Sequence, residues 1–337
     1  MMDITFWTTQ DCNLNCRYCY NRVGNNIKKE YMSYKVIKES FSLLTGLEEW
    51  NKEERFFISF HGGEPLLNCD AIEEIMNTVE KAVAREKIVY GMTTNGTLYG
   101  QRQKEIIKKL DNISVSVDGK SDIHNLYRVY LNGEGSFERV IKTAKEISKY
   151  KKIRIRVTVT HKTILFLYET ICFFLQEGFN KIDPILDMFD SHWVDEDEEL
   201  IIEQFRRVKN YVQENGYDEA SIAGVTYTPL TPKGICDGGV TNFHILPDGT
   251  IYPCSLAVGD TEWIIGRTDQ GLYQEKINLI QKMNDIETNN CIGCSMYKYC
   301  PSSRCKLVNK RISGSYNTAS GIMCLESRLQ LEAAKCV

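Results

Sequence analysis

The chain opens with Ile4-Thr-Phe-Trp-Thr8 and continues shortly afterwards with Cys12-Asn-Leu-Asn-Cys16-Arg-Tyr-Cys19. The first stretch is apolar and predicts a buried strand, so the three cysteines would lie in a loop at its carboxyl end. Three thiolates this close can bind three irons of a 4Fe–4S cluster and leave the fourth iron without a protein ligand. Such an iron can take a substrate or a cofactor. A zinc site and a patch of reactive thiols are the alternatives for the cysteines alone.

The first stretch also begins an alternation of predicted strands and helices. Further strands are expected at 56–60, 87–93, 113–117, 153–160 and 181–186, with helices at 33–50, 70–85, 101–110, 136–150, 165–177 and 195–215. This alternation predicts an α/β fold with a parallel sheet, and the distinctive loops follow strands, where α/β barrels build their sites. We therefore predict a partial (β/α)6 barrel of the TIM type. A doubly wound open sheet is the alternative, but no Gly-x-Gly-x-x-Gly follows the first strand.

The composition of the chain changes near residue 218. Turn residues become frequent, the helical periodicity fades and eight cysteines follow. We predict a barrel domain at 1–217 and a cysteine-rich domain at 218–337, with a bridge region at about 187–235.

The bulk composition excludes several classes of protein. The net charge of −4 gives no broad basic surface for nucleic acid. No signal peptide and no apolar run long enough to span a bilayer is visible, so a cytoplasmic location is expected. In that reducing compartment the 13 cysteines do not predict disulfides. Clustered cysteines instead indicate metal ligands.

Four segments that follow predicted strands complete the pattern. The chain reads Gly62-Gly63-Glu64-Pro65, then Thr94-Asn95-Gly96-Thr97, then Ser116-Val-Asp118-Gly, then His124-Asn-Leu-Tyr-Arg128. The two glycines of the first segment would let backbone pass close to a ligand. Ser116 and Asp118 share a face if the strand continues through them. Each segment alone is compatible with an ordinary turn.

Together with the cysteine loop, and in this order over residues 4–130, these segments resemble the radical S-adenosylmethionine (SAM) enzymes. The resemblance implies that SAM binds the open iron of the cluster held by Cys12, Cys16 and Cys19. It also implies reductive cleavage of SAM to methionine and a 5′-deoxyadenosyl radical, which abstracts a substrate hydrogen.

The resemblance assigns SAM contacts to Gly62, Gly63, Glu64, Pro65, Thr94, Asn95, Ser116, Asp118 and Arg128. Tyr18 would flank the adenine, although a core aromatic is the alternative. Arg128 could pair with a carboxylate or simply cap a turn. Asn125 stands where the family commonly has Asp. No catalytic base is assigned.

The cysteines after residue 218 resemble the SPASM domain, an extension of radical SAM peptide maturases that carries two auxiliary clusters. The resemblance assigns Cys291, Cys294, Cys300 and Cys324 to one cluster, and Cys236, Cys254 and Cys305 to the other. The spacing before Cys305 is one residue longer than in the family. The second cluster lacks a ligand, which Asp237 or a substrate thiolate could supply. Structural zinc is the alternative for this region.

Three 4Fe–4S clusters and SAM are therefore the expected cofactors, and a flavodoxin or a ferredoxin the expected type of electron donor. The expected substrate is a ribosomally made precursor peptide or a protein. Because the sequence starts at the first strand, we expect the leader to be bound either by a separate leader-binding protein or by the barrel rim and the segment 187–235.

The reaction favoured by the sequence is formation of a thioether crosslink. Sulfatase maturases of the family place an Asp after the cysteine of a Tyr-Pro-Cys hairpin, whereas Ser255 follows Cys254 here. Formylglycine formation, carbon–carbon or carbon–oxygen crosslinking and epimerisation are alternatives. Cys69, Cys172 and Cys336 could donate a hydrogen atom, although buried inert thiols are the simpler interpretation. A non-catalytic electron carrier has no use for the SAM-contact segments.

Overall fold

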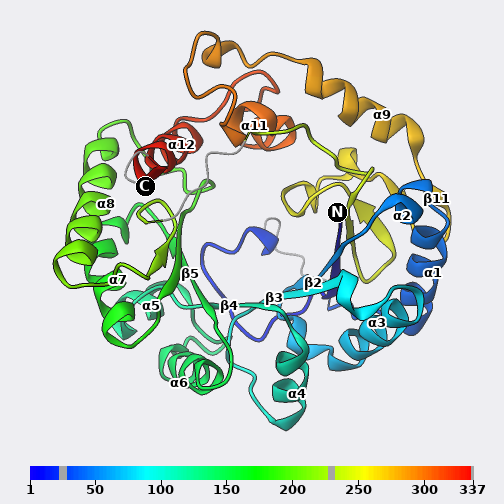
Figure 1. Ribbon diagram of the computed structural model, residues 1–337, viewed down its shortest axis with the longest axis horizontal. Coiled ribbons are helices and arrows are strands. Elements are labelled where there is room, and N and C mark those ends of the chain that lie inside the picture. The colour runs from blue at the N-terminus through cyan, green and yellow to red at the C-terminus, as the bar shows by residue number, and fades with distance from the viewer. Residues whose placement is uncertain (23–28, 227–231, 335–337) are drawn as a thin grey trace. The chain divides into compact units, whose positions relative to one another are not determined.

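A computed structural model describes residues 1–22, 29–226 and 232–334. The chain divides into two compact units, and Figure 1 labels the helices and strands that they contain. Unit 1 contains Met1–Asn15, Cys19–Ser114 and Cys236–Met283. Unit 2 contains Cys16–Tyr18, Val115–Ile235 and Asn284–Val337. This division does not follow the boundary expected near residue 217, because the segment that begins at Cys236 groups with the first strands. Cys336 lies outside the described residues.

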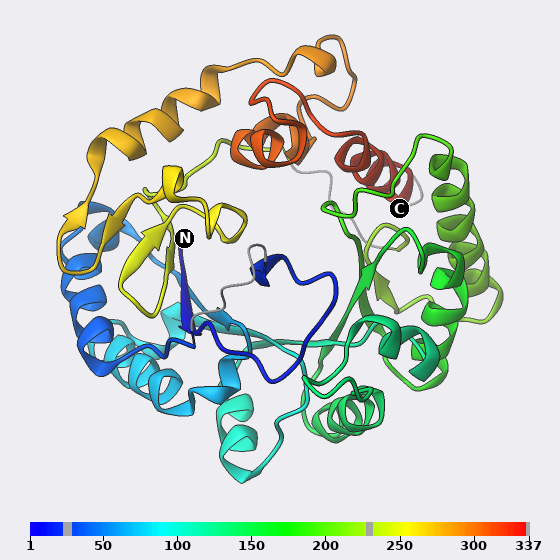
Figure 2. The same cartoon turned by 180° about the vertical axis from the view of Figure 1, so that it is seen from behind.

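Unit 1 is built on a parallel sheet of apolar strands. β1 (Met2–Thr9) pairs in parallel with β2 (Phe56–Gly62), and β2 pairs in parallel with β3 (Ile88–Thr94). β1 is almost wholly buried, as a strand covered on both faces requires. The helices of this part are α1 (Tyr34–Thr45), α2 (Glu48–Lys52), α3 (Cys69–Ala82) and α4 (Gln101–Lys109). Figure 2 shows α1 beside α3 from behind.

Side-chain caps set the starts of α1 and α3. Ser33 accepts a hydrogen bond from the Val36 amide, as its position before the helical pattern predicts. The single helix expected at 33–50 is wrong, because it ends at Thr45 with Gly46 as its C-cap and α2 follows separately. The next helix begins one residue earlier than expected, since Asn68 rather than Asp70 caps it through the Ala71 amide.

A hairpin from the cysteine-rich region extends this sheet. β8 (Asn242–Ile245) pairs in parallel with β1 and antiparallel with β9 (Thr250–Tyr252). The Pro247-Asp-Gly249 turn predicts the hairpin, and the structure confirms it. Its attachment to β1 was not predicted. The sheet continues with β10 (Gly266–Arg267) and β11 (Gly271–Leu272), and α9 (Gln274–Lys282) follows.

Unit 2 continues the alternation of strands and helices. β4 (Asn112–Ser116) lies at the division between the units, and β5 (Arg154–Val159), β6 (Lys181–Leu186) and β7 (Ser221–Ile222) follow in parallel order. The helices are α5 (Ser121–Tyr127), α6 (Phe137–Ser148), α7 (Leu167–Gln176) and α8 (Asp197–Glu214). In β5 and β6 the even and odd positions alternate between buried and half-exposed. The predicted α/β class with a mostly parallel sheet is confirmed.

The end of the chain is helical. α10 (Pro301–Arg304), α11 (Lys306–Ser313) and α12 (Gly321–Ala334) belong to unit 2, and α12 contacts α8. Among the residues that the structure describes, no helix has the length and apolar character needed to cross a bilayer.

Candidate SAM and iron–sulfur sites

The cysteine loop follows β1 directly, as the sequence predicts. Cys12, Cys16 and Cys19 are all half-buried thiols. Asn95 Nδ2 lies 3.8 Å from Cys12 Sγ, and Arg128 Nη1 lies 3.9 Å from Cys16 Sγ. Donors of this kind stabilise negatively charged sulfur, so the loop suits thiolates that bind iron.

The glycines of the Gly62-Gly63-Glu64-Pro65 segment have a structural cause that the sequence did not reveal. A Cβ atom at Gly62, where φ is +133°, would lie 1.9 Å from the Thr9 carbonyl oxygen. At Gly63 it would lie 2.1 Å from the Asp11 carbonyl oxygen and 2.9 Å from Cys12 Cβ. The backbone that passes close to these glycines is therefore the start of the cysteine loop. We expected this close approach to come from a ligand.

Replacing Gly63 with alanine should move the cysteine loop. The new methyl group would overlap backbone atoms, which cannot rotate away as a flexible side chain can. We expect Gly63→Ala to lose most of the iron bound at the first cluster and most SAM cleavage, as measured by iron analysis and 5′-deoxyadenosine formation. Gly46→Ala is the control, since a Cβ there would come no closer than 3.4 Å to a neighbouring atom. Full iron content in Gly63→Ala would contradict this explanation.

Glu64 connects two of the predicted segments and is fully buried. Its Oε1 accepts hydrogen bonds from the Leu66 amide and Thr94 Oγ1, at 3.1 and 2.8 Å. Its Oε2 accepts one from the Asn95 amide at 2.7 Å. Pro65 is buried behind it, at the start of a short 3-10 helix (Pro65–Leu67). This carboxylate fixes the backbone geometry of both segments.

Asn95 and Thr97 hold the cysteine loop from the other side. Asn95 Nδ2 donates to Asn13 Oδ1 at 2.9 Å, and Asn13 Nδ2 donates to Thr97 Oγ1 at 2.8 Å. Asn95 Oδ1 accepts hydrogen bonds from the Thr97 amide and hydroxyl. Asn13 was missed as a site residue, although its place between the first two cysteines was a usable signal.

A second buried carboxylate organises the corresponding part of unit 2. Asp118 Oδ2 accepts hydrogen bonds from Tyr18 Oη at 2.5 Å and from Arg128 Nε at 2.9 Å. Its Oδ1 accepts the Thr158 amide at 3.0 Å. Asp118 is 2% exposed and Arg128 8%. Of the two interpretations of Arg128, pairing with a carboxylate is confirmed, but the carboxylate is the protein's own.

Tyr18 and Ser116 lie beside this pair. The Tyr18 ring is half-exposed and lies 5.4 Å from Arg128 Cζ. Burial raises the pKa of the Tyr18 hydroxyl well above its usual range, which keeps it a donor to Asp118. Ser116 is buried and is the last residue of β4. The strand ends there, two residues before Asp118.

The turn after Asp118 is held by a neutral histidine. Burial lowers the pKa of His124 to about 4. Its Nδ1 accepts the Asp118 amide at 3.2 Å, so its Nε2 carries the proton and donates to Ser136 Oγ at 2.9 Å. Asn125, the departure from the family pattern, accepts the Phe137 amide with its side-chain oxygen at 3.1 Å. An amide serves that purpose as well as a carboxylate.

Four cysteines of unit 2 lie close enough to influence one another's charge. Burial raises the pKa of the Cys291 thiol, and the charges of Cys300, Cys294 and Cys324 raise it further. This is the set that the sequence assigns to one auxiliary cluster. The Cys300 thiol is buried and lies 3.1 Å from Ser327 Oγ. Four interacting thiols fit the ligand set of a 4Fe–4S cluster.

Two lysines near these cysteines were not predicted. Lys233 Nζ donates to Ser303 Oγ at 2.8 Å and lies 3.4 Å from the centre of the Tyr297 ring. Lys306 is 5% exposed and donates to Thr288 Oγ1. Burial lowers the pKa of both amines, while the charge of Cys291 raises it. Nothing in the local sequence distinguishes these lysines from surface ones.

The three cysteines predicted to bind the other auxiliary cluster are divided between the two units. Cys236 and Cys254 are half-buried in unit 1, and Cys305 is half-buried in unit 2, directly before α11. A Cβ at Gly238 would lie 2.7 Å from Pro253 Cβ, so the segments after Cys236 and before Cys254 are in contact. Asp237 Oδ2 accepts the Thr241 hydroxyl at 2.7 Å. Ser255 begins a short 3-10 helix (Ser255–Ala257).

Within residues 1–22, 29–226 and 232–334, no three His, Cys, Asp or Glu side chains converge as ligands of one metal ion do. The cysteines of a cluster bind different irons, so they surround the cluster and do not converge on one point.

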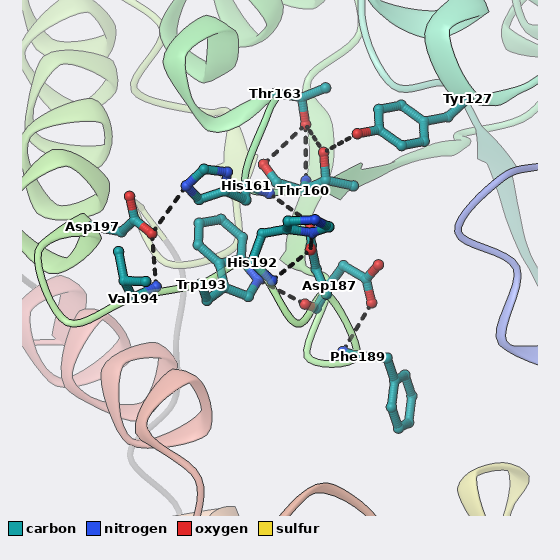
Figure 3. Close-up of polar contacts among 11 residues, drawn as sticks. Tyr127, Thr160, His161, Thr163, Asp187, Phe189, His192, Trp193, Val194 and Asp197 are labelled. Atoms are coloured by element: carbon teal, nitrogen blue, oxygen red, sulfur yellow. Dashed lines mark hydrogen bonds and ion pairs between the residues drawn. The ribbon is translucent and has the colours of Figure 1, made fainter.

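The loop after β6 forms a polar network (Figure 3). Asp190 Oδ1 pairs with His192 Nδ1 at 2.7 Å, and Asp190 Oδ2 accepts the His161 amide at 3.0 Å. Trp193 Nε1 donates to the Asp187 carbonyl oxygen at 2.8 Å. The same loop, from Met188 to Asp195, lines a cavity of about 780 Å³ together with Cys324 and neighbouring residues of α12. From the sequence, these residues could line a surface that binds a leader peptide, but loop residues without a chemical role are the preferred interpretation.

Comparison with known proteins agrees with this site. Residues 8–174 match the model of the Radical SAM superfamily. A cysteine-type anaerobic sulfatase-maturating enzyme of Clostridium novyi (strain NT) is 27% identical over 342 aligned residues, which cover 94% of this chain and 90% of the relative.

Two solved structures are similar in fold. Native anSMEcpe with bound AdoMet and the Cp18Cys peptide has a TM-score of 0.77 at 20% identity, covering 99% of this chain and 96% of its own. Streptococcus suis SuiB bound to the precursor peptide SuiA has a TM-score of 0.70 at 17% identity, and the match covers 96% of this chain and 75% of the SuiB chain.

Proposed function

Because the chain belongs to the Radical SAM superfamily, we propose that it is a maturase that oxidises a cysteine residue of a peptide or protein substrate. SAM bound at the Cys12–Cys16–Cys19 cluster supplies the 5′-deoxyadenosyl radical. The observation that carries the proposal is the group of four interacting thiols Cys291, Cys294, Cys300 and Cys324. A cluster bound by these thiols could take the electron that oxidation of the substrate releases.

The chain's own residues have defined parts in this proposal. Glu64 and Asn95 fix the segments beside the cysteine loop, and Arg128 places a positive charge near Cys16. The SAM contacts that we propose remain those assigned from the sequence, namely Tyr18, Gly62, Gly63, Glu64, Pro65, Thr94, Asn95, Ser116, Asp118 and Arg128. Since Glu64 and Asp118 are occupied by protein partners, they act mainly by holding the backbone and side chains around SAM.

The product that we favour is a thioether crosslink of a precursor peptide. A substrate thiolate can complete the cluster assigned to Cys236, Cys254 and Cys305. Formylglycine is the second candidate, supported by the similarity to the Clostridium novyi sulfatase-maturating enzyme along most of the chain. Ser255 counts against it, because a serine hydroxyl is a poor base near neutral pH. A flavodoxin or ferredoxin as electron donor and a separate leader-binding protein complete the proposed partners.

A cysteine substitution in the second group of thiols tests the proposal. We expect Cys291→Ala to lose about four of about twelve irons per chain and to stop peptide modification, while slow SAM cleavage without product continues. Iron analysis, 5′-deoxyadenosine formation and peptide mass spectrometry measure the three effects. Cys69→Ala is the control, since that buried thiol lies in α3 outside all three groups. Full iron content in Cys291→Ala would show that these thiols do not bind a cluster.

A further inference from the structure

The proposed reaction needs a proton acceptor that the sequence did not supply. Whether the product is a thioether or formylglycine, the substrate cysteine loses its thiol proton as its carbon or sulfur is oxidised. Family members of the sulfatase-maturing kind place a carboxylate after the hairpin cysteine, where this chain has Ser255. A base must therefore come from another position. In α/β folds of this kind, catalytic residues lie in the loops that follow the carboxyl ends of the parallel strands.

Asp187 occupies such a position. It directly follows β6, and its amide donates to the Val159 carbonyl oxygen at the end of β5. By strand alternation its side chain shares a face with Asp183 and Ile185, which are half-exposed, whereas Ile182 and Leu186 are buried.

The site built around Asp118 lies at the same end of these strands. Thr158 of β5, whose amide donates to Asp118 Oδ1, is paired in register with Ile185 of β6. Asp187 is the next residue on that face towards the carboxyl end of the strand. Because a strand amide points along the sheet, the bond from Thr158 places the Asp118 carboxylate near the carboxyl end of β5, the same end at which Asp187 follows β6.

The loop after β6 fixes the Asp187 carboxylate without neutralising it. Its Oδ1 accepts the Phe189 amide at 3.0 Å, which is the one hydrogen bond to this carboxylate among the described residues. Figure 3 shows the carboxylate directed away from the His161, His192 and Trp193 rings. Asp190, whose charge acts on Asp187, is itself held by His192 and the His161 amide.

The chemical state of Asp187 suits proton transfer. Partial burial raises the pKa of its carboxyl group, and the charge of Asp190 adds to this effect, while the Phe189 amide opposes it. A carboxylate with a raised pKa accepts protons more readily near neutral pH than an ordinary surface carboxylate. The cavity of about 780 Å³ that begins with the next residue, Met188, also exposes Cys324. A peptide in that cavity would lie close to one cluster ligand and to the start of this loop.

We propose that Asp187 is the general base that accepts the thiol proton of the substrate cysteine. This inference rests on the proposed function. In the formylglycine case the 5′-deoxyadenosyl radical takes a hydrogen atom from the cysteine Cβ, so that a C–H bond breaks and one forms in 5′-deoxyadenosine. The S–H proton passes to Asp187, one electron passes to an auxiliary cluster, and a C=S bond forms. In the thioether case the same proton is lost, and the sulfur bonds to the carbon radical of another residue, whose extra electron also passes to an auxiliary cluster.

The test compares wild-type protein with Asp187→Asn and Asp187→Glu on the Cp18Cys peptide, deuterated at the cysteine Cβ. We expect Asp187→Asn to form modified peptide at least about 100-fold more slowly, yet still to transfer deuterium into 5′-deoxyadenosine. The ratio of 5′-deoxyadenosine to product should rise accordingly. Asp187→Glu should recover part of the activity, which a merely structural role would not explain.

Asp183→Asn is the matched control. Asp183 lies on the same face of the same strand, but its carboxylate pairs with Arg154 Nε at 3.1 Å, so its removal should leave the ratio unchanged. Iron content and melting temperature show whether each variant is folded. An Asp187→Asn protein with wild-type product yield would overturn the role of Asp187. A wild-type protein that neither changes this peptide nor forms additional 5′-deoxyadenosine with it would contradict formylglycine formation as the reaction, and with it the role of Asp187 in that reaction.

Discussion

Cys16→Ala should abolish SAM cleavage and leave the iron of the auxiliary clusters in place. Cys16 is one of only three thiolates proposed for the first cluster, and Arg128 Nη1 lies 3.9 Å from its sulfur. Without the Cys16 thiolate the cluster keeps only two protein ligands, and the Arg128 guanidinium loses the sulfur that it stabilises. The cluster should therefore not assemble in stable form. We expect about eight of about twelve irons per chain to remain and 5′-deoxyadenosine to fall below detection.

Cys172→Ala provides the control for this variant. Cys172 is a buried thiol on α7, and burial raises its pKa, so it should be an inert core residue. We expect it to keep the full iron content and the wild-type rate of SAM cleavage. If Cys16→Ala still cleaved SAM, the first three cysteines would not be the ligands of the SAM-binding cluster. A loss of all iron would show instead that assembly of the clusters is coupled.

The strands of the barrel were predictable because each is a short apolar run between turn residues. β6 was predicted to the residue, and the ends of β1 and β2 were missed by one or two residues. The two-residue strand β7 and the attachment of β8 to β1 were missed. A pairing between residues so far apart in the sequence depends on tertiary packing, which a local pattern does not contain.

The predicted site residues were found on the expected segments, but several of their roles were not predictable. Residue 63 must be glycine because a Cβ there would overlap the backbone of the cysteine loop. The Glu64 carboxylate accepts hydrogen bonds from Leu66, Thr94 and Asn95. The sequence states which residue types are present, whereas the partner of a buried carboxylate depends on which loops approach it. For the same reason Asp187 looked like an ordinary loop residue until its strand face was known.

The buried pair of Asp118 and Arg128 should have the largest effect on stability. Asp118→Leu would leave the Arg128 guanidinium buried without its carboxylate, and it would also remove the acceptor for Tyr18 Oη and the Thr158 amide. Removing one partner of a buried ion pair costs about 3–5 kcal/mol. We expect a decrease of this size in the free energy of unfolding, measured by urea titration of anaerobically purified protein.

The double variant Asp118→Leu/Arg128→Met separates the charge effect from the lost hydrogen bonds. Replacing both members of a buried pair by apolar residues removes the uncompensated charge, so the double variant should be more stable than Asp118→Leu alone by about 1–3 kcal/mol. SAM cleavage should not recover with it, because the cation near Cys16 is absent and Tyr18 has lost its acceptor. Equal stability of the single and double variants would mean that Asp118 acts through its hydrogen bonds to Tyr18 and Thr158, and that its charge is not needed to balance Arg128. Recovery of both stability and SAM cleavage would instead show that the pair stabilises the fold and has no part in the SAM site.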